Sequence, residues 1–150
     1  MKIFIDTEFT DFTDTQLISI GLAAESGEFF YAELPFDHIK SSDFVFKNVI
    51  PLLTPEKSLM SYVDFRIRLL AWLTGLWSGG GNLEICFDFD GDFQLLEHAW
   101  EDQIPVWCKP RHVGRNINEL YRLEYHKKHN LPEHHALNDA MAIRYAFRER

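Results

Sequence analysis

Apolar and polar positions follow two different periods along the chain, and each change of period marks a change of secondary structure. Three segments near the N-terminus are rich in β-branched and aromatic residues: Lys2–Phe9, Gln16–Ala24 and Glu28–Leu34. This composition predicts three strands. The links between them are short, and the last is the turn Glu25-Ser26-Gly27. We therefore expect an antiparallel meander of three strands.

The middle of the chain changes pattern twice. Pro35–Ser58 contains three prolines and a polar run, which predicts an irregular excursion with one helical turn near Asn48–Leu53. From Leu59 to Trp77 apolar residues recur with a helical period, and the Ser-Gly-Gly-Gly sequence that follows ends the predicted helix.

In the second half of the chain, strands alternate with helices. The expected strands are Leu83–Phe89 and Pro105–Cys108, and the expected helices are Phe93–Glu101, Asn116–Lys128 and Ala136–Arg150. A helix before each later strand is the connection that parallel strands require. We therefore predict an α/β fold in a single domain over residues 1–150. Its mixed five-stranded sheet would combine the antiparallel meander with two parallel strands, flanked by helices.

Composition narrows the function classes. The chain carries 15 Lys and Arg against 23 Asp and Glu, a net charge of −8. This charge argues against a nucleic-acid coat protein or a basic membrane-surface module. It leaves room for a nucleic-acid enzyme, because metal ions in a carboxylate cluster can reverse the local field where a phosphate binds.

Cysteine content and hydropathy predict the compartment. Cys86 and Cys108 have apolar or aromatic neighbours, which is typical of buried thiols in a reducing environment. The N-terminal apolar run is too short for a signal peptide, and the stretch Leu69–Trp77 is too short to span a bilayer. We expect a cytoplasmic protein without a membrane partner.

Acidic residues gather where predicted strands end or helices begin. Asp6 and Glu8 end the first strand, the run Asp88-Phe89-Asp90-Gly91-Asp92 follows the fourth, and Asp139 lies near the start of the last helix. Taken singly, each group is typical of a turn or a helix cap. Together at one point, the carboxylates would repel one another, which predicts divalent cations with oxygen ligands, either Mg²⁺ or Mn²⁺.

Three sequences carry a family resemblance: IDTEFT from residue 5, DFDGDFQLL from residue 88 and HHALNDA from residue 134. They resemble, in order, the three motifs of the DEDDh branch of the ribonuclease H-like superfamily, the group of ribonuclease T and oligoribonuclease. The resemblance implies a ribonuclease H-like fold and a metal-dependent 3′–5′ exonuclease. Such an enzyme hydrolyses RNA or single-stranded DNA from the 3′ end and releases nucleoside 5′-monophosphates.

The resemblance also implies roles for individual residues. Asp6, Glu8, Asp92 and Asp139 match the four acidic metal ligands of a site for two Mg²⁺ or Mn²⁺ ions, with Asp6 shared between the ions. His134 precedes Asp139 by five positions, as the catalytic histidine does in the family, and is the expected general base. His135 would then be a bystander.

Substrate contacts follow from the same resemblance. Phe9, Thr10 and Phe12 lie just after the first motif, where relatives contact the terminal nucleotide through backbone groups and base stacking. Asp88 stands where many relatives carry Asn and is a possible assistant to Asp92, with Asp90 the weaker choice. Two basic clusters, Lys109–Arg115 and Lys127–His129, are further candidates for phosphate contact, although solvated surface is the better interpretation of the second.

The same resemblance favours RNA as the substrate. The inserted segment Phe44–Leu53 resembles that of small stand-alone bacterial 3′–5′ exoribonucleases. Many relatives dimerise, and a homodimer is expected.

Two other functions fit parts of the sequence. Ile85–Asp92 resembles the nucleophile motif of haloacid-dehalogenase-type phosphatases, with Asp88 as nucleophile and Asp90 as acid. Asp92 then replaces the usual Thr or Val, and too few residues follow for the later motifs. A non-catalytic nucleic-acid-binding module on a ribonuclease H-like fold is the second alternative. Such a module is expected to have lost a metal ligand, and none of the matched ligands is lost here.

Overall fold

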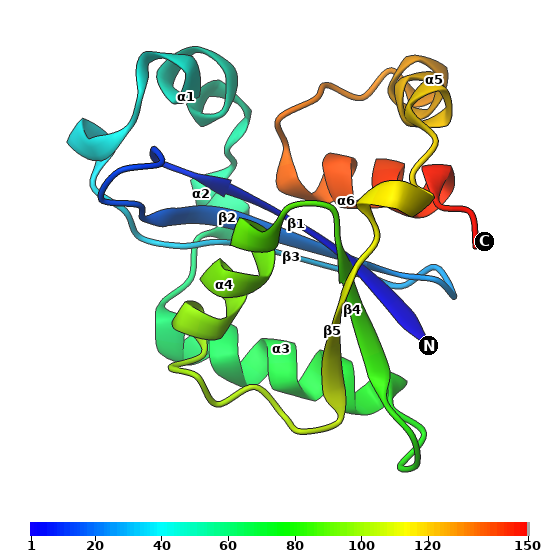
Figure 1. The fold of residues 1–150 in the computed structure, drawn as a ribbon. Helices are drawn as coiled ribbons and strands as arrows, with labels where there is room; N and C mark the ends of the chain where they lie inside the picture. The colour runs from blue at the N-terminus through cyan, green and yellow to red at the C-terminus, as the bar shows by residue number, and fades with distance from the viewer. Residues whose placement is uncertain (150) are drawn as a thin grey trace.

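A mixed sheet organises the chain. The computed structural model describes residues 1–149, and the strands lie in the order β3-β2-β1-β4-β5 (Figure 1). Their bounds are β1 (Lys2–Phe9), β2 (Leu17–Ala24), β3 (Phe29–Glu33), β4 (Leu83–Phe87) and β5 (Cys108–His112). β1, β2 and β3 form an antiparallel meander, whereas β4 and β5 run parallel to β1. The predicted α/β fold with a mixed five-stranded sheet is confirmed, and it is compatible with a ribonuclease H-like fold.

Helices cover both faces of this sheet. The helices α3 (Tyr62–Leu76) and α4 (Asp90–Ala99) lie on one side, and α6 (Ala136–Ala146) lies on the other with α5 (Glu119–His129) packed against it (Figure 1). Capping side chains explain two helix starts. Ser61 accepts a hydrogen bond from the N–H of Asp64, and Asn118 accepts two in the first turn of α5. These helices therefore begin at Tyr62 and Glu119, later than the predicted Leu59 and Asn116.

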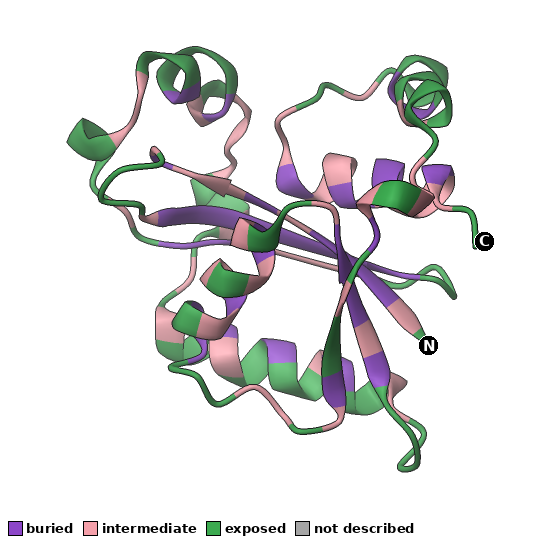
Figure 2. Ribbon diagram, in the orientation of Figure 1, coloured by how far each residue is buried: buried purple, intermediate pink, exposed green. Residues whose placement is uncertain are grey.

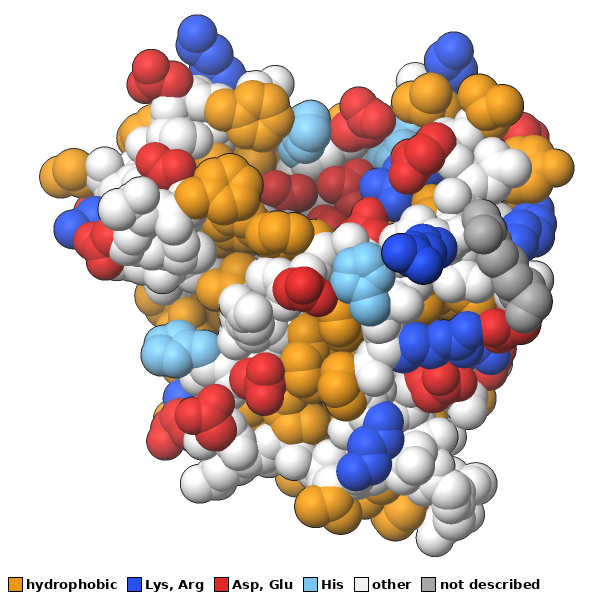
Figure 3. Space-filling model, in the orientation of Figure 1, with side chains coloured by type: hydrophobic (Ala, Val, Ile, Leu, Met, Phe, Trp, Pro, Cys, Tyr) orange, Lys and Arg blue, Asp and Glu red, His pale blue; other side chains and the backbone are white. Residues whose placement is uncertain are grey.

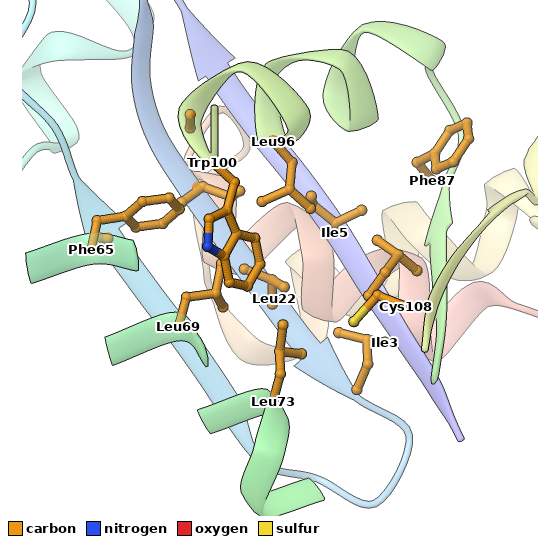
Figure 4. Close-up of a cluster of buried hydrophobic side chains, with 14 of the residues drawn as sticks. Ile3, Ile5, Leu22, Phe65, Leu69, Leu73, Phe87, Leu96, Trp100 and Cys108 are labelled. Carbon is orange, nitrogen blue, oxygen red and sulfur yellow. The ribbon is translucent and has the colours of Figure 1, made fainter. Parts of the chain in front are cut away.

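Strand alternation divides the core between the two faces. Ile3, Ile5 and Leu22 point toward the helix layer of α3 and α4 (Figure 4). This layer contributes Phe65, Leu69 and Leu73 of α3, Leu96 of α4, and Trp100 at the C-cap of α4. Phe4, between Ile3 and Ile5, points the other way and packs with Ile143 of α6. The buried positions concentrate on the strands and on the inner sides of the helices (Figure 2). The residues of β1 at even positions therefore face α6.

The excursion contains more helix than predicted. Residues 35–58 form α1 (Asp43–Asn48), α2 (Pro55–Ser58) and the 3₁₀ turns η1 (His38–Lys40) and η2 (Ile50–Leu52). Val45 and Val49 pack on Ile18 as a separate hydrophobic cluster. This segment is therefore attached to the sheet and projects beside the carboxyl end of β1 (Figure 1).

Two other predicted boundaries were wrong. β5 spans Cys108–His112 instead of Pro105–Cys108, because an edge strand tolerates Lys, Arg and Pro. α4 begins at Asp90 instead of Phe93, since acidic residues are favourable in the first turn of a helix.

The C-terminal helix is shorter than predicted. α6 ends at Ala146, because Phe147 leaves the helix, bridges to Ile117 and packs its ring 5.2 Å from that of Phe4. The predicted helix end at Arg150 lies outside the described residues. β4 likewise ends at Phe87, before the predicted Phe89.

Cys86 and Cys108 are buried and unpaired with each other, as predicted. Burial raises the pKa of the Cys86 thiol to about 12 and that of Cys108 to about 11, so neither thiol ionises near neutral pH. Within residues 1–149, none of the helices combines the length and apolarity needed to cross a bilayer.

Gly21 sets the distance between the sheet and α6. It lies on β2 directly opposite Asp6 of β1. A Cβ atom at this position would lie 2.5 Å from the backbone N and Cα of Leu137. No side chain larger than hydrogen fits there, so glycine lets the first turn of α6 approach the strand beside Asp6.

We predict that Gly21→Ala destabilises the protein by about 1–3 kcal/mol or more, because backbone atoms of α6 must move to admit the methyl group. Urea unfolding measures this loss. Gly75→Ala is the matched control. Apart from the neighbouring backbone of α3, no atom of residues 1–149 lies within 4 Å of a Cβ added at Gly75, and the alanine should stabilise the helix by about 0.5–1 kcal/mol. Equal stability of the two variants would contradict the close packing of α6.

Candidate active site

The alternation of β1 places two carboxylates on the face that α6 covers. Asp6 and Glu8 follow Phe4 at intervals of two residues, so they share its side of the sheet. α6 starts against Gly21, the partner of Asp6, and Asp139 lies in its first turn. Thr7 points to the opposite face, where its hydroxyl donates a 2.6 Å hydrogen bond to Oδ1 of Asp92 on α4. One short strand therefore connects acidic groups from both helix layers.

The predicted acidic residues come together as two adjoining groups. Ligand atoms of Glu8, His134 and Asp139 lie within 4.8 Å of one another, and so do those of Asp6, Asp88 and Asp92. The acidic and histidine side chains line the floor of a hollow between α1 and α5 (Figure 3). Each of the two groups holds enough oxygen or nitrogen donors for one divalent cation.

Burial and mutual repulsion perturb the carboxyl groups. Burial, followed by the charge of Asp139, raises the pKa of Glu8 to about 8. Burial also raises the pKa of Asp92 to about 7, although the hydrogen bond from Thr7 opposes this shift. The pKa values of Asp6 and Asp139 are raised as well, in both cases mainly by burial. Without a compensating cation, the cluster therefore holds protons near neutral pH.

Asp92 shows that the site suits a cation. It is 2% exposed, and Oδ2 is buried without a hydrogen-bond partner within residues 1–149. A buried carboxylate oxygen with no donor is costly, and a metal ion beside Asp6 and Asp88 would satisfy it. The carboxylate oxygens in both groups fit hard divalent cations such as Mg²⁺ and Mn²⁺.

The two neighbouring histidines have different surroundings. His134 lies outside α6 with a left-handed backbone (φ 67°), and its N–H donates to Oδ2 of Asp139 at 3.1 Å. His135 is the N-cap residue of α6, and its ring stacks on Tyr31 at 4.5 Å with Nδ1 buried. His134 therefore faces the acidic cluster as expected. His135 instead packs toward the sheet, against Tyr31 of β3.

α5 contributes two residues that the motifs did not indicate. Nη2 of Arg122 lies 2.6 Å from Oδ2 of Asp88, and Nε2 of His126 lies 3.4 Å from Oδ1 of Asp139. His126 is also held by a 3.1 Å contact between Nδ1 and the carbonyl of Leu131. Arg122 and His126 are four residues apart on a predicted helix, so they lie on the same face of it. This spacing is the sequence feature that could have indicated them. Arg122 therefore partly offsets the negative charge of Asp88.

An aromatic cavity borders the acidic groups. Phe9, Phe12 and Phe89 line a space of about 240 Å³, with the Phe9 and Phe89 rings stacked at 6.2 Å. Phe12 is 79% exposed and contacts both rings edge-on. The cavity lies between the carboxyl end of β1 and the start of α4. Its lining residues Phe9 and Gly91 are the chain neighbours of Glu8 and Asp92.

Two predicted substrate contacts are engaged within the protein. Thr10 is fully buried, and its N–H, carbonyl and hydroxyl bond to Gln16 or Ser42. The expectation that Thr10 contacts substrate is therefore corrected, because Thr10 instead holds the loop between β1 and β2 and the start of α1. Of the basic cluster on β5, Arg111 is paired with Glu84 and Glu149.

Curated relatives identify the family. Two 3′-5′ exoribonucleases of Mycobacterium tuberculosis, Rv2179c and MT2234.1, come from different strains. Each is 39% identical to this chain over 135 residues, which cover 82% of the chain and 73% of the relative. This chain belongs to that 3′-5′ exoribonuclease family. No protein-family model matches it.

Membership of the exoribonuclease family bears on the phosphatase alternative. A phosphatase would need Asp88 as a nucleophile and Asp90 as an acid beside it. Asp88 is instead paired with Arg122 and grouped with Asp6 and Asp92. Asp90 is exposed in the first turn of α4. The observed grouping thus matches the exonuclease motifs better than the phosphatase motif.

We predict that the metal-free protein loses stability as pH rises from about 5 to about 8. The pKa of Glu8 is raised from 4.5 to about 8 and that of Asp92 from 3.8 to about 7. Between these values the folded state binds more protons than the unfolded chain, so unfolding becomes easier as pH increases. Melting temperatures in EDTA measure the effect, and Mg²⁺ should reduce it by offsetting the ionised carboxylates.

Glu8→Gln provides the control for this titration. The amide cannot ionise, so the variant should show a weaker decline of melting temperature with pH in EDTA. A wild-type melting temperature that is constant or increases over this range would contradict the raised pKa values.

Proposed function

We propose that this chain is a metal-dependent 3′–5′ exonuclease that favours RNA, also accepts single-stranded DNA, and releases nucleoside 5′-monophosphates. The observation that carries the proposal is the grouping of Asp6, Glu8, Asp88, Asp92 and Asp139 beside His134. The 3′-5′ exoribonuclease activity of the two relatives supports it. The order of the three motifs supports assignment to the DEDDh branch and to a ribonuclease H-like fold. The single domain, the homodimer and the cytoplasmic location stay predictions.

Two divalent cations fit the donor set. Asp6 and Asp92, with Asp88, would hold one, and Glu8 with Asp139 would hold the other. Bound there, Mg²⁺ or Mn²⁺ would stabilise the attacking and leaving oxygens of an in-line phosphodiester displacement. The Oδ2 of Asp92, which has no hydrogen-bond partner in the described part of the chain, and the raised pKa values of the carboxyl groups support this assignment.

His134 is the proposed general base. Its ring nitrogen lies in one group with carboxylate oxygens of Glu8 and Asp139, and its backbone is tied to Asp139. A neutral imidazole can accept the proton of the attacking water. The water oxygen then bonds to phosphorus as the bond to the 3′-oxygen of the preceding nucleotide breaks. That oxygen takes up a proton from solvent.

The aromatic cavity is the proposed site for the terminal base. Phe9, Phe12 and Phe89 offer apolar faces beside the acidic cluster, and stacking on an aromatic side chain contributes about 1–3 kcal/mol per base. Stacking is tolerant of sequence. Asp88 is held by Arg122 and assists Asp92.

We predict that oligonucleotides labelled at the 5′ end are shortened one nucleotide at a time from a free 3′-hydroxyl, with Mg²⁺ or Mn²⁺ and not with EDTA. RNA should be degraded faster than DNA of the same sequence. Gel ladders and chromatography of the 5′-monophosphates measure the reaction. Asp6→Asn should be inactive while folded, because it removes a carboxylate ligand that the proposed cation site requires.

Three outcomes of this assay would oppose the proposal. Internal cuts would contradict recognition of the 3′ end. With a small phosphomonoester added in parallel, release of phosphate from it without shortening of the oligonucleotides would favour the phosphatase. Binding of RNA without hydrolysis in either metal would favour the non-catalytic module.

We predict that His134→Ala lowers kcat by about 100- to 10,000-fold, the usual cost of removing a general base. The acid limb of its pH–rate profile should flatten, whereas metal binding survives because all the carboxylates remain. His135→Ala is the matched control, and it should retain most activity below its melting temperature but lower stability through the lost stacking on Tyr31. If His135→Ala abolished activity and His134→Ala did not, the general base would be His135 instead of His134.

A further inference from the structure

Phe44 is a large apolar side chain that the hydrophobic core does not use. It lies on α1 and is 52% exposed. Its neighbours Val45 and Val49 attach this segment to Ile18. The packing of α1 on the sheet therefore gives no reason for an aromatic residue at position 44.

The ring of Phe44 instead contacts the proposed general base. The centroids of Phe44 and His134 lie 4.9 Å apart with an interplanar angle of 86°, an edge-on arrangement that aromatic pairs favour. No hydrogen bond to the His134 ring is found within residues 1–149, and only its backbone N–H is fixed, by Asp139. The contact with Phe44 is thus a restraint on the ring itself.

The position of Phe44 is tied to the strand that carries the acidic residues. The N–H of Ser42 donates a 2.9 Å hydrogen bond to the carbonyl of Thr10 at the end of β1. The hydroxyl of Ser42 then caps α1 by accepting from the N–H of Val45 at 3.2 Å. Since Phe44 lies between these two residues, the start of α1 is fixed relative to Glu8 and Asp6.

We propose that Phe44 is a positioning residue that holds the His134 imidazole in the orientation for proton transfer at the acidic site. The proposal rests on the proposed function, in which His134 accepts the proton of the attacking water. His134 lies in the loop before α6, and the hydrogen bond from its N–H to Asp139 holds its backbone rather than its ring. The excursion would thereby form one wall of the hollow and also orient the base (Figure 3).

Phe44→Ala tests this role against Phe46→Ala. Phe46 lies on the same helix and is 45% exposed, and within residues 1–149 it forms no aromatic pair with a histidine. Phe44→Ala should lower kcat by about 10- to 100-fold with KM nearly unchanged, because small misplacements of a reacting group are costly. Phe44→Tyr should restore most of the rate. Phe46→Ala should leave kcat and KM unchanged.

A double variant separates positioning from substrate contact. If Phe44 acts through His134, adding Phe44→Ala to His134→Ala should cause no further loss of kcat. A rise in KM with kcat unchanged, or an equal loss in both backgrounds, would overturn the inference and indicate direct contact between Phe44 and RNA. Should His134→Ala alone retain full activity, the proposed base fails and this inference fails with it. If His134 is essential but the effect of Phe44→Ala is the same with and without His134, only the positioning role of Phe44 fails, and the proposed function stands.

Discussion

Repulsion among closely spaced carboxylates is the constraint that the rest of this structure accommodates. Asp6, Glu8, Asp88, Asp92 and Asp139 meet at one end of the sheet, and burial together with mutual charge raises several of their pKa values. Isolated buried charge is expensive, so the fold surrounds the cluster with compensating groups. Asp92 and Asp139 lie in first turns of helices, where the helix dipole favours negative charge. Arg122 and His126 approach from α5.

The architecture brings these groups together through a single strand. Alternation along β1 directs Asp6 and Glu8 toward α6 and Thr7 toward α4, so both helix layers join at the strand. Gly21 then decides how near α6 can come. Among the residues that the structure describes, no donor reaches the buried Oδ2 of Asp92, which is the arrangement expected of a site completed by cations.

Two segments outside the motifs form the walls of the hollow. α1 supplies Phe44, which rests on the proposed base, and α5 supplies Arg122 and His126. The motif residues carry the proposed chemistry, whereas these walls restrain or neutralise them. An exonuclease requires both, because the rate depends on the orientation of the base as well as on its presence.

The sequence by itself determined the strands of the meander, the long helices, and the acidic residues and histidine of the three motifs. These features depend on local periodicity and on short spacings within one element, which a single chain displays directly. Tertiary structure alone decided that β5 includes Lys109–His112, since edge strands tolerate residues typical of loops. It alone buried Thr10, stacked His135 on Tyr31 and placed Phe44 against His134. Each of these depends on contacts between residues far apart in the chain, and no local pattern encodes which distant side chain fills a given space.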